Sequence, residues 1–541
     1  MPWSRRAALV LALLIFTVAG PQVTTPQNPY DLIITNGVII DGTGAPSFRA
    51  DVGIRAGRIE KIGALAHAPA LTRIDAQGQV VAPGFIDVHS HIEDPVKLVT
   101  TRLRADNFLL QGVTTVITGN CGTSATDIAA FLGKLARLKL AVYVATLVGH
   151  NSVRRQVCGA RPNPTPEQMA RMEAVIRDGI RAGALGFSTG LCYQPGLNAG
   201  EDEVVELARV AAQEHAIYAT HLRDEASDEP AALAEAVRTA QRAGCMRLHI
   251  SHFKAAGKSQ WGTARARLDG ARQTAGAAIR VTSDLYPYTA LSSTLEYLIP
   301  PQAVAQTGGA RASYSAARAI DVTLQKLQRD GWQDYSNVRV SFSIKHKEWV
   351  GKTIPEIVRR ETGSDSARAQ AAWILSHRGT GDIQVVAEEM EEQDVDQLIS
   401  APDMVFGADS SIHYRGLGQP HPRGQGTFPR ILGEYVRQQK LLTLEDAIHR
   451  ASGLAAEIFA LPHRGLIREG NWADLVIFDP TRIQDRATYS EPFNPPLGIA
   501  YVVVNGAVAA RGTTLTGAMA GRPVTRDERV VKPRPASPGA K

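Results

Sequence analysis

The feature that most limits the possible folds is a series of eight short apolar segments, most of them separated by helical patterns. The predicted strands are 85–89, 114–118, 141–147, 185–188, 218–221, 248–252, 279–284 and 405–409. Strands that alternate with helices form parallel sheets, and eight such repeats indicate a closed barrel. We therefore expect an α/β fold built on a TIM-like (β/α)8 barrel.

Two of the helical patterns between these strands are well defined in the sequence. Residues 229–244 follow Asp228, a candidate N-cap, carry Pro230 in the first turn and end at Gly244. Proline near the start and glycine at the end are typical helix boundaries. Residues 201–215 form the second pattern. Both helices are expected to act as crossovers between parallel strands.

The stretch between the seventh and eighth predicted strands, residues 285–404, is far longer than an ordinary loop. Segments of that length inside a compact domain contain secondary structure of their own. We expect a lid-like insert at about 292–350, followed by helices at 354–362 and 385–400.

The two ends of the chain have a different texture, in which short strand-like runs are separated by turn signals such as NG and DGTG. These runs are 31–40, 51–62, 72–81, 473–480 and 500–512. We expect the two ends, 30–82 and 465–522, to pair into one small β-sandwich beside a barrel domain at 83–464. The Lys/Arg/Pro-rich residues 523–541 are expected to form a flexible tail.

The first residues resemble an export signal. Arg5 and Arg6 precede the apolar run 7–20, which ends in small residues, and this order is typical of a secretory signal peptide. The run is shorter than the ~20 apolar residues that span a bilayer, although an uncleaved N-terminal anchor remains open. We expect residues 1–25 to direct export, either to the periplasm or to a membrane-anchored position.

Composition excludes several classes of partner. Apolar residues make up 44% and charged residues 21% of the chain, as in ordinary soluble globular proteins. The net charge of +6, from 59 basic and 53 acidic residues, is too diffuse for nucleic-acid binding but suits small anions. No obligatory protein partner is indicated, and the sequence leaves the oligomeric state open.

Side chains that bind metals gather at the ends of the predicted strands. They are His89, His91, Cys121, His221, His252 and Asp409. In such barrels the functional groups lie at the carboxyl ends of the strands, and imidazole, thiolate and carboxylate are the usual zinc ligands. Each of these residues taken alone could have a purely structural role, but their gathering at one rim of the barrel favours a metal site. We therefore expect Cys121 to be a thiolate ligand rather than half of a disulfide.

Several longer motifs resemble those of the amidohydrolase superfamily and, within it, the N-acyl-D-amino-acid deacylases (D-aminoacylases). These motifs are PGFIDVHSH, GVTTVITGNCG, STGLCYQPG, THLRDE, SHFK, DLYPYTA, HPRGQGTFPRIL and HRGLIREGNWADLVIFDP, and the resemblance covers about residues 31–522. It implies a zinc-dependent hydrolase that cleaves the amide bond of N-acyl-D-amino acids, small molecules, to a carboxylic acid and a free D-amino acid. Many superfamily members carry a metal-bridging lysine on the fourth strand; here that strand reads LGFSTG, and Cys121 matches the cysteine of the deacylase branch.

The resemblance also implies roles for individual residues. Cys121, His221 and His252 would hold a tightly bound zinc, and His89 and His91, sharing Cys121, would hold a second, weaker metal. Asp409 would be the general base and acid. Lys254, Tyr286 and Arg423 match positions that bind the substrate carboxylate in that family, and Tyr193 lies in the matching pocket segment.

The chain departs from the family pattern at three positions. Family members usually carry SDG at the last strand, where this chain has ADSS, so Ala408 and Ser410 differ beside Asp409. Relatives often have a second histidine where this chain has Phe253. A metal-dependent dipeptidase acting on peptides with a C-terminal D-residue, or a cyclic amidase, therefore remains an alternative. Less favoured are a serine hydrolase using Ser188 in GFSTG and a non-catalytic binding protein.

Overall fold

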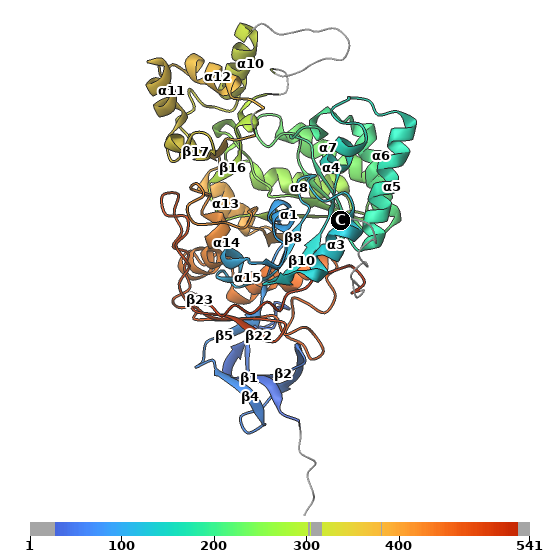
Figure 1. Ribbon diagram of the computed structural model, residues 1–541, viewed down its shortest axis with the longest axis vertical. Coiled ribbons are helices and arrows are strands. Elements are labelled where there is room, and N and C mark those ends of the chain that lie inside the picture. Colours follow the sequence, from blue (N-terminus) through green and yellow to red (C-terminus); the bar gives the residue numbers. More distant parts are fainter. Residues whose placement is uncertain (1–27, 301–302, 304–315, 380, 529–541) are drawn as a thin grey trace, which may run out of the picture.

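The computed structural model describes residues 28–300, 303, 316–379 and 381–528. Figure 1 shows a small β-rich end, a central body of strands and helices, and an outer insert at the opposite end. The expected signal at 1–25 and the last part of the expected tail lie outside the described residues. Among the residues described, no helix combines the length and apolar character needed to cross a membrane.

The central body is built on parallel strands. They are β6 (Phe85–Asp87), β8 (Val113–Thr118), β10 (Tyr143–Thr146), β11 (Val148–Gly149), β12 (Gly186–Gly190), β13 (Ile217–His221), β14 (Arg247–Ile250), β15 (Arg280–Leu285) and β19 (Met404–Phe406). They pair in the orders β10-β8-β6 and β11-β12-β13-β14-β15-β19, and only Leu147 separates β10 from β11. Strands therefore occur at all eight predicted places.

The chain that follows the first strand lies beside the chain that follows the last. The amide N–H of Asp409 donates to the carbonyl of His89 at 2.8 Å, and that of His91 to Ser410 at 2.9 Å. β6 and β19 end two and three residues before His89 and Asp409. The backbone of Asp409 has a φ of 45°, a left-handed conformation that is incompatible with a strand at this position. The predicted strands 85–89 and 405–409 were therefore too long.

Helices surround these strands and connect them. They are α1 (Glu93–Leu98), α2 (Asp106–Leu109), α3 (Ile128–Arg137), α4 (His150–Val157), α5 (Pro166–Ala182), α6 (Glu201–Gln213), α7 (Glu229–Ala243), α8 (Ala264–Ala275), α13 (Glu392–Ile399), α14 (Arg423–Arg430), α15 (Leu444–Ala451) and α16 (Gly453–Ile458). The predicted helices at 201–215 and 229–244 correspond to α6 and α7, and Gly244 ends α7 at a φ of 74°. Asp228 does stand at the N-cap, but its side chain makes no capping hydrogen bond and lies 3.6 Å from Arg329 instead.

The insert between β15 and β19 forms a unit with its own core. Its antiparallel sheet has the order β16-β18-β17, and its core includes Trp349, Trp373 and Ile374. The elements are β16 (Ala290–Thr294), β17 (Val338–Phe342), β18 (Gln384–Glu388), α10 (Ala316–Arg329), α11 (Ile354–Thr362) and α12 (Ala367–Ser376). The insert thus extends well beyond residue 350.

One helix prediction in this region is confirmed and one is partly wrong. α11 has the predicted bounds 354–362. The predicted helix 385–400 instead begins as strand β18, and only α13 is helical. The reason is tertiary, because Val385 and Val386 pair with β16 on one side and β17 on the other, and β-branched residues suit such a central strand.

Both ends of the chain contribute to one nine-stranded sheet. Its strands are β1 (Tyr30–Ile39), β2 (Phe48–Arg55), β3 (Arg58–Gly63), β4 (Ala70–Asp75), β5 (Val80–Pro83), β20 (Leu475–Phe478), β21 (Ile499–Val504), β22 (Ala507–Arg511) and β23 (Thr514–Leu515). β5 and β20 join the two halves as an antiparallel pair. In the expected tail, Val524 is buried and its N–H donates to Val144 on β10, so the tail is packed at its start.

A buried ion pair connects this sheet to the central body. Arg464 Nη1 lies 2.9 Å from Asp474 Oδ2, and both side chains are at most 7% exposed. The guanidinium also covers the ring of Tyr143 on β10 at 3.7 Å. Asp474 accepts the N–H of Asn505 with its other oxygen.

We predict that Arg464→Met destabilises the protein by about 3–5 kcal/mol, because it leaves the Asp474 carboxylate buried without its cation. Urea unfolding measures the change. As the control, Arg55→Met removes an exposed pair with Glu60 and should cost about 1 kcal/mol or less. Equal effects of the two substitutions would contradict the prediction.

Candidate metal centre

The thiol of Cys121 lies at the point where the ends of four strands meet. Its Sγ is 3.2 Å from His89 Nε2, 3.5 Å from His221 Nδ1 and 3.4 Å from His252 Nε2. All four residues are buried. The four cysteines lie in the described part of the chain, and each is a free thiol.

A second group of ligand-type atoms shares His89 with the first. His91 Nε2 lies 3.1 Å and His89 Nε2 3.6 Å from Asp409 Oδ1. His91 is partly exposed, whereas His89 is fully buried. The structure therefore brings together all six ligand-type residues predicted from the sequence. In the described part of the chain, ligand atoms close enough to share a metal form three overlapping groups: His89, Cys121 and His252; His89, His91 and Asp409; and His221, Glu225 and His252.

Two buried carboxylates that the sequence analysis missed fix the histidines from behind. Asp284 Oδ1 accepts from His249 Nε2 at 2.9 Å and from the backbone N–H of His252 at 3.0 Å, while Oδ2 lies 3.3 Å from His89 Nδ1. Asp87 accepts the backbone N–H groups of His89 and Ala408, both at 3.0 Å. Such contacts orient imidazole ligands. Asp284 stands at the end of a predicted strand, as the predicted ligands do, and this position could have identified it as a site residue from the sequence.

Glu225 is the third residue that sequence reasoning missed. Its Oε1 accepts from Lys254 Nζ at 2.6 Å and lies 3.0 Å from His252 Nδ1, and its Oε2 lies 3.6 Å from His221 Nε2. The side chain is 5% exposed. Glu225 follows His221 by four residues in the motif THLRDE, and this short spacing from a predicted ligand could have identified it as a site residue.

The electrostatics of the site differ from one histidine to the next, since burial is outweighed at His89, where the carboxylates of Asp284 and Asp409 raise the pKa of the imidazole. Burial lowers the pKa of His221 well below its usual value, and burial together with Lys254 lowers that of His252. Burial opposes the ionisation of Asp409, but Arg423 and the neighbouring histidines outweigh it, so the pKa of this carboxyl lies well below its usual range. The site thus favours neutral imidazoles at His221 and His252 beside a charged carboxylate at Asp409.

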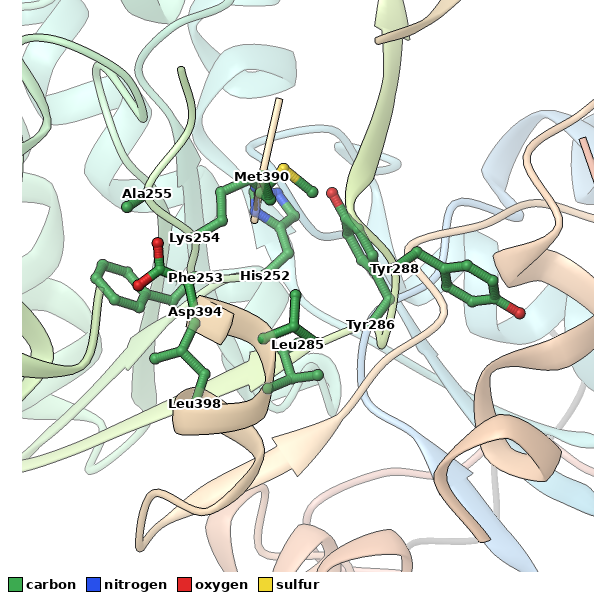
Figure 2. A pocket seen from close by; sticks show the side chains of 11 residues that line it. His252, Phe253, Lys254, Ala255, Leu285, Tyr286, Tyr288, Met390, Asp394 and Leu398 are labelled. Carbon is green, nitrogen blue, oxygen red and sulfur yellow. Dashed lines mark hydrogen bonds between the residues drawn. The ribbon is translucent and has the colours of Figure 1, made fainter. Parts of the chain in front are cut away.

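The four residues expected to bind substrate surround this centre. Arg423 Nη1 lies 3.0 Å from Asp409 Oδ2, and its guanidinium lies 4.3 Å from the centre of the Tyr286 ring. The rings of Tyr193 and His221 are 4.8 Å apart. Lys254 sits in a pocket that Figure 2 shows, together with His252 and Tyr286. All four expected residues therefore lie at the metal-ligand cluster.

Ser188 lies on β12 and not at a strand-to-helix turn. Its hydroxyl donates to the carbonyl of Gly119 and accepts the N–H of Gly122 at 3.2 Å. A serine nucleophile needs a sharp turn that exposes its oxygen, with a base beside it. Ser188 instead ties two strands together, so the serine-hydrolase alternative fails.

The residues present fit a zinc ion. For tetrahedral zinc with Zn–S near 2.3 Å and Zn–N near 2.0–2.1 Å, a ligand sulfur and nitrogen lie about 3.5 Å apart. The separations from Cys121 Sγ to the three imidazole nitrogens, 3.2, 3.5 and 3.4 Å, are close to that value. Burial, together with the nearby carboxylates of Asp409, Glu225 and Asp284, raises the pKa of the Cys121 thiol well above its usual value, so a thiolate at this position requires a bound cation.

These features define a metal-dependent hydrolase of the amidohydrolase class, and the chain belongs to the amidohydrolase family. Residues 72–510 match the family profile, described as "Amidohydrolase family", and residues 17–84 also match the N-terminal domain of the urease alpha subunit. The resemblance seen in the sequence motifs is therefore confirmed.

Within this family, the chain is similar to deacylases of N-acyl-D-amino acids. It is 35% identical to N-acyl-D-glutamate deacylase of Alcaligenes xylosoxydans xylosoxydans over 89% of this chain and 93% of the relative. It is 33% identical to D-aminoacylase of the same organism over 92% and 98% of the two chains.

Solved structures show the same likeness. A crystal structure of D-aminoacylase, 31% identical, matches with a TM-score of 0.78 over 92% of this chain and all of the other. The N-acyl-D-glutamate deacylase of Bordetella bronchiseptica, complexed with zinc and a phosphonate mimic of the tetrahedral intermediate, is 33% identical and matches with a TM-score of 0.77 over 92% of this chain and all of the other. The architecture of this chain is therefore that of the deacylase structures.

We predict that Cys121→Ala lowers metal affinity by at least about 10–100-fold, the size of effect seen when residues that merely orient metal ligands are changed. Metal content of the purified variant, measured by mass spectrometry, gives the result. Cys245→Ala is the matched control, because Cys245 is also a buried free thiol but its Sγ contacts the carbonyl of Ala208. Full metal occupancy in Cys121→Ala would refute the ligand assignment.

Proposed function

We propose that the protein is a zinc-dependent deacylase that hydrolyses N-acyl-D-amino acids to a carboxylic acid and a free D-amino acid. The observation that carries this proposal is the convergence of Cys121 and three imidazoles beside the Asp409–Arg423 pair. That arrangement supplies a metal site, a base and a carboxylate-binding cation in one place. The deacylase relatives and the zinc-bound Bordetella structure support the same reaction and the D-configuration.

In this proposal Cys121, His221 and His252 hold the tightly bound zinc, and His89 and His91, sharing Cys121, hold a weaker second metal. A zinc ion bound there lowers the pKa of a water molecule towards ~7 and polarises the amide carbonyl. The contacts of Asp284 with His89 Nδ1 and of Glu225 with His252 Nδ1 support these roles, because they leave Nε2 of each ring facing the thiol.

Asp409 is the proposed general base and acid. It accepts a proton from the attacking water and delivers a proton to the leaving nitrogen, so the amide and one water become an acid and an amine. Its ion pair with Arg423 keeps the carboxylate charged and ready to accept that proton. Its neighbours Ala408 and Ser410 differ from the family pattern without removing these contacts.

Arg423, Tyr286, Tyr193 and Lys254 are the proposed substrate contacts. The guanidinium of Arg423 offers parallel hydrogen bonds to the α-carboxylate. The Tyr286 hydroxyl is buried, and within the described part of the chain it lacks a hydrogen-bond partner. Buried hydroxyl groups of this kind are normally satisfied, which supports a contact with bound substrate.

A dipeptidase or cyclic amidase is less well supported. D-hydantoinase of Ralstonia pickettii matches only 12% of this chain. A D-hydantoinase structure matches over 93% of this chain with a TM-score of 0.53 at 18% identity, and such a likeness carries only the fold. A non-catalytic relative is also disfavoured, because the six ligand-type residues remain together.

We further propose that the parallel strands close into one (β/α)8 barrel and that the sheet from both chain ends is a β-sandwich, with domains at 30–82, 83–464 and 465–522. The backbone hydrogen bonds that join the ends of β6 and β19 support closure. A separate apolar cluster including Leu32, Ile54 and Ile477 supports the second domain. Export through residues 1–25, to the periplasm or an anchored position, is part of the same proposal and rests on the sequence pattern.

The function is tested by assaying the purified protein on paired N-acetyl-D- and N-acetyl-L-amino acids, with L-D dipeptides and hydantoins alongside and with zinc measured on the same sample. We expect turnover of the N-acetyl-D compounds, at rates that fall when zinc is removed by a chelator and return when it is restored. Turnover of only the L compounds, the dipeptides or the hydantoins would overturn the proposal.

We predict that Asp409→Asn lowers kcat by roughly 10²–10⁴, as expected when a positioned acid–base group is lost, and that the variant keeps its tightly bound zinc. Steady-state kinetics give kcat, and metal analysis of the same preparation gives the zinc content. Loss of the metal would indicate a ligand role instead, and near-normal turnover would remove Asp409 from the mechanism.

We predict that Arg423→Met loses roughly 30-fold to several thousand-fold in kcat/KM on an N-acyl-D-amino acid, because a desolvated charge pair is broken. On the corresponding amide, which has no carboxylate, the loss should be at least tenfold smaller. Since Arg423 lowers the pKa of Asp409, the acid limb of the pH profile should also move to higher pH. Equal losses on the two substrates would assign Arg423 to the fold or the metal site.

A further inference from the structure

We propose that His413 is a positioning residue, which acts through Ser410 to hold Arg423 where the substrate carboxylate binds. This inference rests on the proposed function and adds a residue to it. Ser410 stands beside Asp409 at a position where the chain departs from the family pattern, and the glycine that is usual there has no hydroxyl group to offer. The contact with His413 is therefore a feature of this chain and not of the shared motif.

The side chain of His413 closes a short loop that starts at the proposed general base. Its Nε2 lies 2.9 Å from the hydroxyl oxygen of Ser410, the residue that follows Asp409. The loop is anchored at its start, because the carbonyl of Ser410 accepts the N–H of His91 at 2.9 Å. Ser410 is buried and His413 is partly buried. The hydrogen bond thus restrains the direction in which the chain leaves Asp409.

The ring of His413 packs against the first turn of α14, the helix that begins with Arg423. A Cβ atom added at Gly424 would stand 2.3 Å from Cε1 of His413 and 2.5 Å from the hydroxyl oxygen of Ser410. Only glycine allows the helix backbone to come this close. The residue that follows Asp409 and the residue that follows Arg423 are therefore held against each other through the ring of His413.

Asn107, on α2, also connects these two segments. Its Nδ2 donates to the carbonyl oxygens of Ser411 and Gly424, both at 3.0 Å, and the side chain is buried. With this anchor in place, the contact of His413 controls only the fine position of the helix start. That position matters for Arg423, because displacing a substrate-positioning group by about 1 Å can cost roughly 100-fold in rate.

The ring of His413 acts as a neutral group. Burial and the charge of Arg423 lower the pKa of its imidazole to about 4, so the ring adds no charge beside the guanidinium at neutral pH. Its second nitrogen, Nδ1, is buried and has no hydrogen-bond partner among the residues that the structure describes. The ring therefore contributes one hydrogen bond and its shape, and a neutral amide can replace the hydrogen bond.

The test is a double-mutant cycle between His413→Ala and Arg423→Met, assayed on an N-acetyl-D-amino acid and on the corresponding amide. His413→Ala alone should lower kcat/KM on the acid roughly 10- to 100-fold, because Arg423 is displaced. On the amide, which has no carboxylate for Arg423 to bind, the loss should be much smaller. In the Arg423→Met background, His413→Ala should cost no more than about twofold on the acid, since the group that His413 positions is gone.

Two further variants separate positioning from folding. His413→Gln keeps a neutral hydrogen-bonding group near the place of Nε2 and should restore most of the activity that His413→Ala loses. Ser410→Ala removes the same hydrogen bond without opening a large cavity and should show the same preference for losing the acid. It therefore replaces His413→Ala in the cycle if that variant does not fold.

His449→Ala is the matched control. His449 lies on α15, is also partly buried, and donates from Nδ1 to the carbonyl of Gly42 at 2.8 Å. Its loss removes a histidine contact between two distant segments, as His413→Ala does, but it should leave the ratio of acid to amide turnover as in wild type.

Three results would overturn the inference. They are unchanged activity in His413→Ala, equal losses on the acid and the amide, and a loss in the Arg423→Met background as large as in wild type. The last two would show that His413 supports the fold without positioning Arg423. Failure of the proposed function looks different, because then the wild-type protein hydrolyses no N-acetyl-D-amino acid.

Discussion

The buried thiol of Cys121, surrounded by three imidazole nitrogens, is the constraint on which the rest of the site depends. The four residues come from different strands, so the ends of β6, β8, β13 and β14 must bring three imidazole nitrogens to within 3.2–3.5 Å of one sulfur. Neutral imidazoles and a thiol satisfy one another poorly as hydrogen-bond partners, whereas a shared cation satisfies them all. The parallel strands provide the rigid frame that this convergence requires.

A layer of buried carboxylates keeps that convergence in place. Asp284 holds His89 and His252, and Glu225 holds His252 and lies near His221. A carboxylate buried among apolar groups is costly unless cations or donors surround it, and each of these has several. The same residues therefore orient the ligands and balance the buried positive charge of Lys254.

The insert and the end sheet contribute in different ways. The insert has a separate apolar core, and its last part leads into α13, which forms one wall of the pocket beside Lys254. The end sheet lies at the other end of the molecule (Figure 1) and joins the central body through the pair of Arg464 and Asp474. The insert thus leads into a wall of this pocket, whereas the end sheet is tied to the central body by a buried ion pair.

The sequence by itself determined the alternation of strands and helices, the places of the eight strands and the ligand-type residues at their ends. Local patterns suffice for these features, because periodicity, caps and turns act over a few residues. Helix α11 was found in this way, from the sequence around Ile354–Thr362. The predicted strand ends were less accurate. Asp409 leaves the strand conformation, and its backbone N–H bonds to the carbonyl of His89, a residue far away in the sequence.

Only the tertiary structure decided which distant groups meet. It made a strand of 384–388, because two partner strands became available on either side. It placed Glu225 against Lys254 and Asp284 against His89 and His249, contacts that join residues from 29 to 195 positions apart. Burial and ion pairing depend on the surroundings of a side chain in the folded protein, and no local pattern in the sequence encodes those surroundings.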